Sequence, residues 1–276
     1  MIKVTKIKRR QGRVRTGNQL AHGLVVFFLL LASSLMAQET NVATQLAAGS
    51  SNVLDTYLSP EKYRGMEWRF ISEVDRNSRK HQWQDRGLSY NLTHEGAFAY
   101  LHNRVGNGHE YVGHYAFSYA VMHGWQLSPG IRLSAGAVAD ADLGFSYNSR
   151  NGNNPAQGYG SLALGARFSC SYSFTLFHKC ITVNYEGRVP LFGIMFSPNY
   201  GQSYYEMFNR GNYDNNIVAY SVSPLQLRQQ LSLDIPIAKR TALRIGYLGD
   251  IRQAEPNNLK QHHYYNAATF GVVIRK

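Results

Sequence analysis

Residues 131–147 read IRLSAGAVADADLGFSY, and this stretch decides the fold. Its nine odd-numbered positions, from Ile131 to Tyr147, are all apolar or aromatic, whereas the even-numbered positions between them are mostly charged, polar or small. Successive side chains of a β-strand point to opposite faces, so one face of this strand is continuously apolar and the other is not. A transmembrane barrel strand has this pattern, with its apolar face toward lipid and its polar face toward the interior.

The same alternation recurs along the chain. It predicts nine strands, near residues 66–75, 86–103, 110–126, 130–148, 158–174, 180–193, 224–236, 240–252 and 262–275. Short connections near 128–130, 176–179 and 238–240 alternate with longer ones at 149–157, 194–223 and 253–261. Outer-membrane barrels have short periplasmic turns and longer external loops, so the contrast predicts which end of each strand faces outward.

Antiparallel closure favours an even number of strands, and residues 42–55 (VATQLAAGSSNVLD) are the candidate for the missing one. We therefore predict a closed antiparallel transmembrane β-barrel of about ten strands with a periplasmic C-terminus. Eight strands remain the alternative, in which the N-terminal part forms a plug or a periplasmic extension. A soluble β-sandwich also alternates, but its strands are usually shorter than those predicted here. An interior this small should be largely filled by side chains.

The N-terminal segment has the features of an export signal. Seven basic residues precede Ala21, and Leu24 to Leu35 form an apolar run that is too short to span a bilayer. We expect a signal peptide at 1–37 and a mature barrel domain at 38–276. The formal charge of the chain is +12, but outside those seven residues 22 basic residues face 17 acidic ones. This balance argues against nucleic acid as a partner, because a nucleic-acid-binding domain carries a basic patch of its own.

Four stretches carry a resemblance to a known family. They are residues 52–65 (NVLDTYLSPEKYRG), 144–156 (GFSYNSRNGNNPA), 190–206 (PLFGIMFSPNYGQSYYE) and 243–250 (LRIGYLGD). Together they resemble a family of uncharacterised outer-membrane barrel proteins of Gram-negative anaerobes, defined as a domain of unknown function. The resemblance covers most of the mature chain and implies a barrel in the outer membrane, but it supplies no activity and no catalytic residues. The expected partners are outer-membrane lipid, including lipopolysaccharide, and the assembly machinery of that membrane; the surface ligand stays open.

Charged residues on the predicted inward face form the first candidate site. Asp140 and Asp142 share that face, and paired carboxylates can act as an acid and a base. The same face carries five arginines: Arg132, Arg167, Arg188, Arg228 and Arg244. Buried charges need partners, so we expect an ion-pair plug and a structural or surface-binding protein without catalytic residues. An outer-membrane enzyme, a protease or lipid A modifier using Asp140 and Asp142, is the alternative, as is a narrow pore.

The long external connection at 194–223 is the second candidate site. Its aromatic, amide and charged residues include Tyr200, Gln202, Tyr204, Tyr205, Glu206 and Arg210. The four-residue spacings within this set permit one short helix across the barrel mouth. Long loops usually carry function, so a lid and a ligand-binding surface are both open. We expect no cofactor and no metal, because the ten histidines lack the spacing of a strong zinc site and no phosphate-binding motif is present.

Overall fold

The structure, a computed structural model, describes residues 40–77, 87–221 and 225–276. The predicted signal peptide at 1–37 lies outside this part. The strands are β1 (Thr40–Asp55), β2 (Tyr63–Asn77), β3 (Leu88–His102), β4 (His109–Ser128), β5 (Ile131–Asn148), β6 (Ala156–Leu176), β7 (Lys179–Phe196), β8 (Ile217–Ser221), β9 (Leu227–Ala238), β10 (Thr241–Ala254) and β11 (Gln261–Arg275). Two short helices, α3 (Tyr204–Arg210) and η1 (Pro256–Asn258), lie in the connections. No helix in the described ranges is long and apolar enough to cross a membrane.

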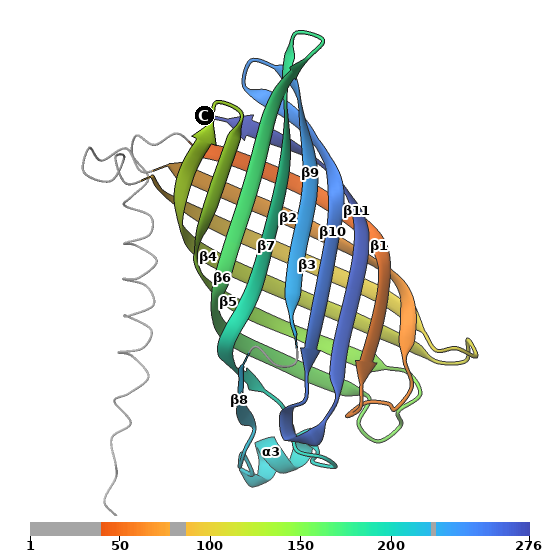
Figure 1. Ribbon diagram of the computed structural model, residues 1–276. Helices are drawn as coiled ribbons and strands as arrows, with labels where there is room; N and C mark the ends of the chain where they lie inside the picture. The colour runs from red at the N-terminus through yellow and green to blue at the C-terminus, as the bar shows by residue number, and fades with distance from the viewer. Residues whose placement is uncertain (1–39, 78–86, 222–224) are drawn as a thin grey trace, which may run out of the picture. The chain divides into compact units, whose positions relative to one another are not determined.

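Ten strands form a closed antiparallel barrel (Figure 1). Strands β1 to β7 pair in chain order, β9 pairs with β7, and β10 and β11 continue to β1, which closes the wall. The prediction that residues 42–55 form a strand is confirmed, because β1 pairs with β11 on one edge and with β2 on the other. The eight-strand alternative is therefore wrong.

Strand β8 was not predicted. It pairs with Phe192–Phe196 of β7, whereas β9 pairs with Thr182–Arg188 of the same strand, so β8 and β9 follow one another along one edge of β7. The change of partner coincides with Pro190, which has no N–H to donate, and with a register shift in the pairing to β6. The predicted loop at 194–223 is consequently shorter, because β7 extends through 196 and β8 takes 217–221.

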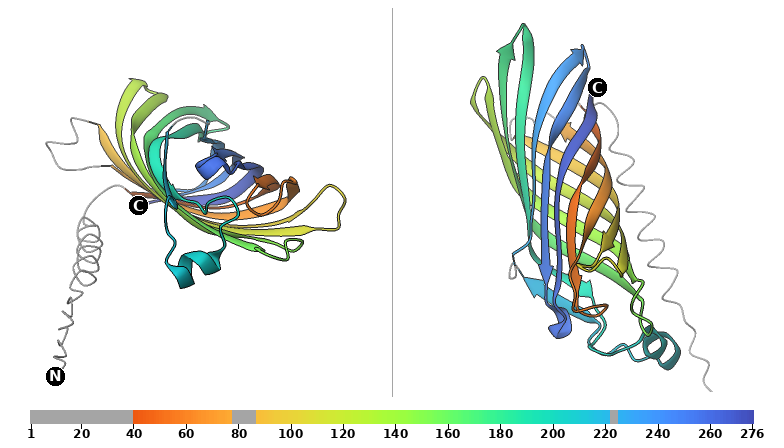
Figure 2. Two further views of the ribbon diagram at one scale, coloured as in Figure 1. Left: turned by 90° about the horizontal axis from the view of Figure 1, so that it is seen from below. Right: turned by 90° about the vertical axis from the view of Figure 1, so that its right-hand side faces the viewer.

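The two ends of the barrel differ (Figure 2). We call one the turn end, since it holds the tight connections at 129–130, 177–178 and 239–240 and both ends of the barrel sequence. The other is the loop end, with α3, β8 and the connections at 56–62, 103–108, 149–155 and 255–260. One connection departs from the predicted contrast in length: more residues separate the end of β2 at Asn77 from the start of β3 at Leu88 than separate β3 from β4 at the loop end.

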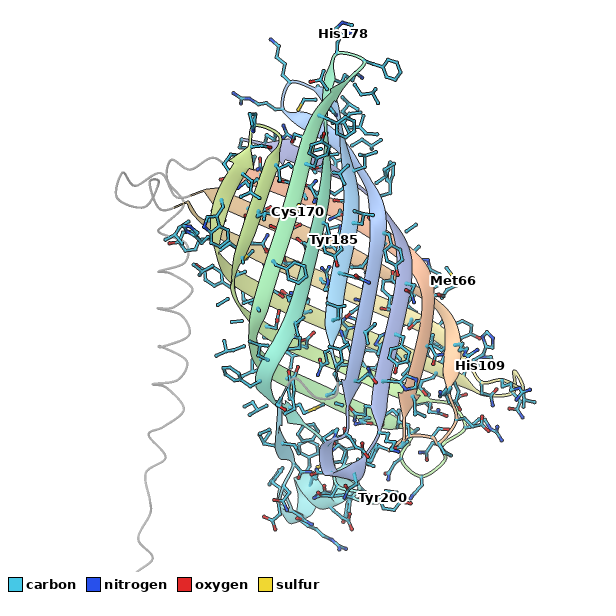
Figure 3. All side chains as sticks on the ribbon, viewed as in Figure 1. Met66, His109, Cys170, His178, Tyr185 and Tyr200 are labelled. Atoms are coloured by element: carbon cyan, nitrogen blue, oxygen red, sulfur yellow. The ribbon has the colours of Figure 1, made fainter. Side chains whose placement is uncertain are left out.

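The outer wall is apolar and the interior is polar, the reverse of a soluble protein. On β5, Leu143 and Phe145 are 66% and 51% exposed on the outer face, as predicted. Figure 3 shows the side chains on this wall, with Met66 at its edge, His178 at the turn end and Tyr200 at the loop end. Inside, charged residues such as Arg69 are almost wholly buried. The alternation therefore places lipid outside and a filled polar lumen inside, as in outer-membrane barrels.

The facing assignment predicts unequal effects of adding a cation to β5. We expect Ala137→Arg to cost about 2–4 kcal/mol in folding into lipid, because a cation then lies on the lipid face near mid-strand. Ser134→Arg should be tolerated better, since Ser134 lines a space that also contains Glu73 and Glu186. Heat-modifiable gel mobility after refolding into lipid vesicles measures both variants. Equal damage at the two positions would contradict the assignment.

Candidate functional site

A network of ion pairs fills much of the lumen. We call it the lumen belt; its members are Arg69, Arg167, Arg188, Arg228, Arg244, Arg252, Glu67, Glu73, Glu95, Glu186, Asp140, Asp142, Asp234 and Asp250. Period-two alternation brings them together, because every second residue of each strand points inward. The belt contains the predicted aspartates and four of the five predicted arginines.

Arg69 on β2 is the hub of the belt. Its guanidinium lies within hydrogen-bonding distance of three carboxylates: Nε is 2.7 Å from Glu67, and Nη1 is 2.6 Å from both Glu95 and Asp250. The same group lies 4.0 Å above the centre of the Tyr265 ring. The Arg69 side chain is fully buried, so all of its charge is compensated by these neighbours.

One ion pair joins opposite walls. Nη2 of Arg228 on β9 lies 2.8 Å from Oε2 of Glu95 on β3. These strands are five positions apart in either direction round the ten-strand ring. From Arg228 the network continues to Glu186, and from there to Arg167 on β6 at 2.6 Å. Side chains therefore span the whole diameter of the lumen at this level.

The two predicted aspartates do not form a catalytic pair. Asp140 lies 2.9 Å from Arg188, and Asp142 lies 3.0 Å from Arg252. Each carboxylate thus has its own guanidinium, and nothing in this arrangement makes the two share a proton. Whether these pairs plug the lumen stays a prediction.

Arg132 does not join the belt. It makes no ion pair with any residue in the described ranges, and it lies near the turn end beside Gly124. Alternation predicted correctly that Arg132 faces inward. It does not give the position along the barrel axis, and Arg132, the second residue of β5, lies at the turn end of that strand. Conversely, Glu67, Arg69 and Glu73 were not singled out, although the same alternation in residues 66–74 places them inward.

A histidine and a serine in the lumen resemble catalytic components but are arranged differently. Nε2 of His263 lies 2.6 Å from Oε2 of Glu67 and 3.0 Å from Oγ of Ser51. A serine–histidine–acid relay needs the hydroxyl and the carboxylate on different ring nitrogens. Here both partners meet the same nitrogen, so these residues do not form such a relay. Within the described residues, no three His, Cys, Asp or Glu side chains are placed to hold a metal ion.

The belt separates two chambers. The turn-end chamber, of about 190 Å³, is lined by polar side chains, several of them serines, and by the Arg167 and Arg244 side of the belt. The loop-end chamber, of about 160 Å³, is lined by Val112, Tyr159, Met195, Tyr220 and the belt pairs of Asp140 and Asp142. Both chambers contain charged groups, but the walls of the loop-end chamber are more apolar and those of the turn-end chamber more polar.

Residues 197–216, which we call the lid, cover the loop end. The predicted short helix is confirmed as α3. It begins with a capping box, in which the Ser203 hydroxyl accepts from the Glu206 N–H and the Glu206 carboxylate accepts from the Ser203 N–H. It ends at Gly211, whose φ of 68° favours glycine. Within the predicted loop surface, Glu206 is therefore a capping residue.

Two tyrosines anchor the lid on opposite walls. The Tyr204 hydroxyl accepts from the Gly158 N–H at 2.6 Å and donates to its carbonyl at 3.2 Å, which satisfies the edge of β6 beyond its last pairing with β7. Tyr57, in the β1–β2 connection, donates to the Gln202 carbonyl at 2.8 Å. Burial raises the pKa of Tyr57 to about 12, so this hydroxyl stays protonated at neutral pH. The lid thus lies across the mouth, as the spacing predicted.

The remaining predicted loop residues divide into buried and exposed sets. Gln202 is buried and accepts from Asn216 Nδ2 at 2.7 Å, so it holds the two ends of the lid together. Tyr200 and Tyr205 are exposed, and Arg210 lies over the Tyr205 ring. Tyr213, another aromatic residue of the predicted loop, is also exposed, and so is Phe208, which was not predicted.

Comparisons with known proteins agree on the fold. The sequence profile of a family described as "Protein of unknown function (DUF3316)" matches residues 24–275. No curated protein sequence matches the chain significantly. The transport unit of the autotransporter AIDA-I from Escherichia coli has a similar structure, with 10% identity, coverage of 92% of this chain and 97% of that chain, and a TM-score of 0.50. The Escherichia coli outer-membrane protease OmpT matches at 8% identity, with coverage of 87% and 96% and a TM-score of 0.45. At these identities the likeness concerns the fold alone.

Proposed function

The chain belongs to the DUF3316 family, and we propose that this outer-membrane β-barrel is a non-conducting scaffold that acts through its loop-end surface. The observation that carries the proposal is the ion pair between Glu95 and Arg228, which joins diametrically opposite strands. A solute crossing the lumen would have to separate this pair and its neighbours. Breaking a buried pair leaves an uncompensated charge and costs about 3–5 kcal/mol.

The loop end suits a surface role. The lid presents exposed aromatic side chains from Tyr200, Tyr205, Phe208 and Tyr213, and Arg210 beside them. Capping and the tyrosine anchors fix the backbone, so these side chains stand on an ordered platform. Aromatic and arginine side chains are enriched at recognition surfaces. The enzyme alternative has less support, because Asp140 and Asp142 are each held by an arginine.

Single-channel recording tests the proposal. We expect the folded protein in planar lipid bilayers to show no stepwise ion conductance, since the belt closes the lumen beneath the lid. The sample is first checked by heat-modifiable mobility, so that a lack of conductance cannot be caused by misfolded protein. Reproducible unitary conductance of the wild-type protein would favour the narrow pore instead.

The orientation in the membrane is part of the same proposal. We propose that the signal peptide at 1–37 is removed on export, that the turn end and the C-terminus face the periplasm, and that the lid faces outward. Short turns on one side and longer loops on the other support this orientation. N-terminal sequencing of the outer-membrane form should begin near Gln38. Intact Met1 in the membrane fraction would contradict removal of the signal.

A further inference from the structure

We propose that the loop-end chamber binds a small, neutral, polyhydroxylated molecule with the dimensions of a single sugar ring. The chamber lies on the loop-end side of the belt and has a volume of about 160 Å³. Pockets that hold drug-sized molecules start at roughly 300 Å³, so the guest must be smaller than those. The binding site is distinct from the exposed aromatic surface of the lid.

Two tyrosines form the aromatic part of the chamber, and two glycines make room for them. The Tyr159 ring on β6 lies against Gly144 of β5, where any added side chain would collide with it. The Tyr220 ring on β8 lies in the same way against Gly193 of β7. Because neither glycine carries a side chain, each ring sits close to the strand beside it and still lines the chamber. Aromatic rings offer apolar surface to the C–H groups of a sugar and a hydroxyl to its polar groups.

Two ion pairs supply the polar part of the chamber. Arg188–Asp140 and Arg252–Asp142 have N–O distances of 2.9 and 3.0 Å. Their side chains remain partly accessible, between 11% and 23%, whereas the Arg69 side chain has no exposure. Guanidinium groups only donate and carboxylates only accept. A hydroxyl both donates and accepts, so neighbouring hydroxyls on one molecule can satisfy both members of a pair.

The charge pattern disfavours small ions. The lining carries both signs, Asp140, Asp142 and Asp250 with Arg188, Arg228 and Arg252, and each already has a partner of opposite sign, so a small anion or cation would gain little net attraction. A purely apolar molecule would remove water from the two ion pairs without replacing its hydrogen bonds, which is costly. A neutral polyol replaces those hydrogen bonds and adds no charge.

Direct binding measurements test the class of ligand. The mature protein, folded in a zwitterionic detergent without a sugar head group, is titrated with glucose, galactose and N-acetylglucosamine and followed by saturation-transfer NMR and calorimetry. We expect at least one of these neutral sugars to bind. Glucuronate, glucosamine and hexanol should each bind about ten-fold more weakly or worse, a difference of ~1.4 kcal/mol. Absence of binding by every neutral sugar, or equal binding of a charged analogue, would overturn the proposal.

Variants locate the binding in the chamber. Ala163→Leu adds bulk to the chamber wall and should abolish sugar binding. Tyr220→Ala should weaken it about ten-fold by removing the ring, whereas Tyr220→Phe should keep most of the affinity. Tyr220 lies on β8, outside the ten barrel strands, so heat-modifiable folding should persist. Tyr172→Ala, on the outer face of β6 near the turn end, is the matched control and should leave sugar binding unchanged.

Two outcomes with these variants separate this inference from the proposed function. Sugar binding that survives Ala163→Leu but is lost in Tyr205→Ala would place the ligand on the lid surface and refute the chamber site. Conductance by the wild-type protein would refute the non-conducting scaffold, yet it would leave the binding measurements and their variants unaffected. The two proposals can therefore fail independently.

Discussion

Replacing Arg69 with methionine is expected to destabilise the barrel by about 3–5 kcal/mol. The change keeps an unbranched apolar stem but removes the charge that neutralises Glu67, Glu95 and Asp250. Three carboxylates would then share the buried centre of the lumen with less compensation, and their mutual repulsion would oppose folding. Methionine also loses the contact of the guanidinium with the Tyr265 ring.

Denaturant unfolding in lipid vesicles, followed by heat-modifiable mobility, measures this effect. Arg240→Met provides the control, because Arg240 is exposed in the turn between β9 and β10 and makes no ion pair with a described residue. Adding Glu67→Gln to Arg69→Met should restore part of the loss, since Glu67 pairs with no other arginine among the described residues. A loss below about 1 kcal/mol for Arg69→Met, the usual worth of an exposed pair, would show that water compensates the belt.

Alternation predicted nine of the ten barrel strands because it records which face each residue occupies. The tenth, β1, was inferred from the even strand count that antiparallel closure needs, since its inward face carries Ala43, Gln45 and Ala47 and contrasts weakly with its outward face. It failed for β8, because five residues, IVAYS, are too few to display a period. The change of partner at Pro190 depends on how two strands share an edge of β7, which no local pattern encodes.

The charged site was predictable only in part, for a related reason. The period of two predicts that Arg167, Arg188, Arg228 and Arg244 point inward, but it does not give their partners. The Arg228–Glu95 pair depends on barrel closure and on the stagger of the strands, which bring positions 133 residues apart to the same height. Arg132 points to the predicted face and still lies outside the belt, because its height places it near the turn end.

In the lid, too, the sequence pattern predicts the element but not the surroundings of its side chains. The spacing of Gln202, Glu206 and Arg210 was sufficient to predict a helix, and the helix is present. Spacing could not tell which of these side chains would be exposed. The capping role of Glu206 and the buried amide of Gln202 are set by the fold of the whole lid.

Deleting residues 203–214 is expected to leave the barrel folded and still without conductance. The deletion removes α3, but the ends that remain are close, since Gln202 Oε1 lies 2.7 Å from Asn216 Nδ2. The belt beneath the lid is formed by strand residues only, so its ion pairs should persist. Compared with the wild-type protein, the deleted form should admit small sugars to the loop-end chamber faster, which the NMR titration would detect.

Combining this deletion with Glu95→Ala and Arg228→Ala should have the largest effect on conductance. The double substitution removes one charge of each sign, so it opens the centre without changing the net charge of the belt. The lid helix is then absent and the central ion pair of the belt is removed. We expect this combined variant to show stepwise ion conductance in planar bilayers, whereas either change alone should give none. The double substitution with the lid intact is the matched control. Conductance from the deletion alone would mean that the lid, and not the belt, closes the lumen. A combined variant that folds but does not conduct would mean that the remaining pairs, such as Arg167–Glu73, are sufficient to close it.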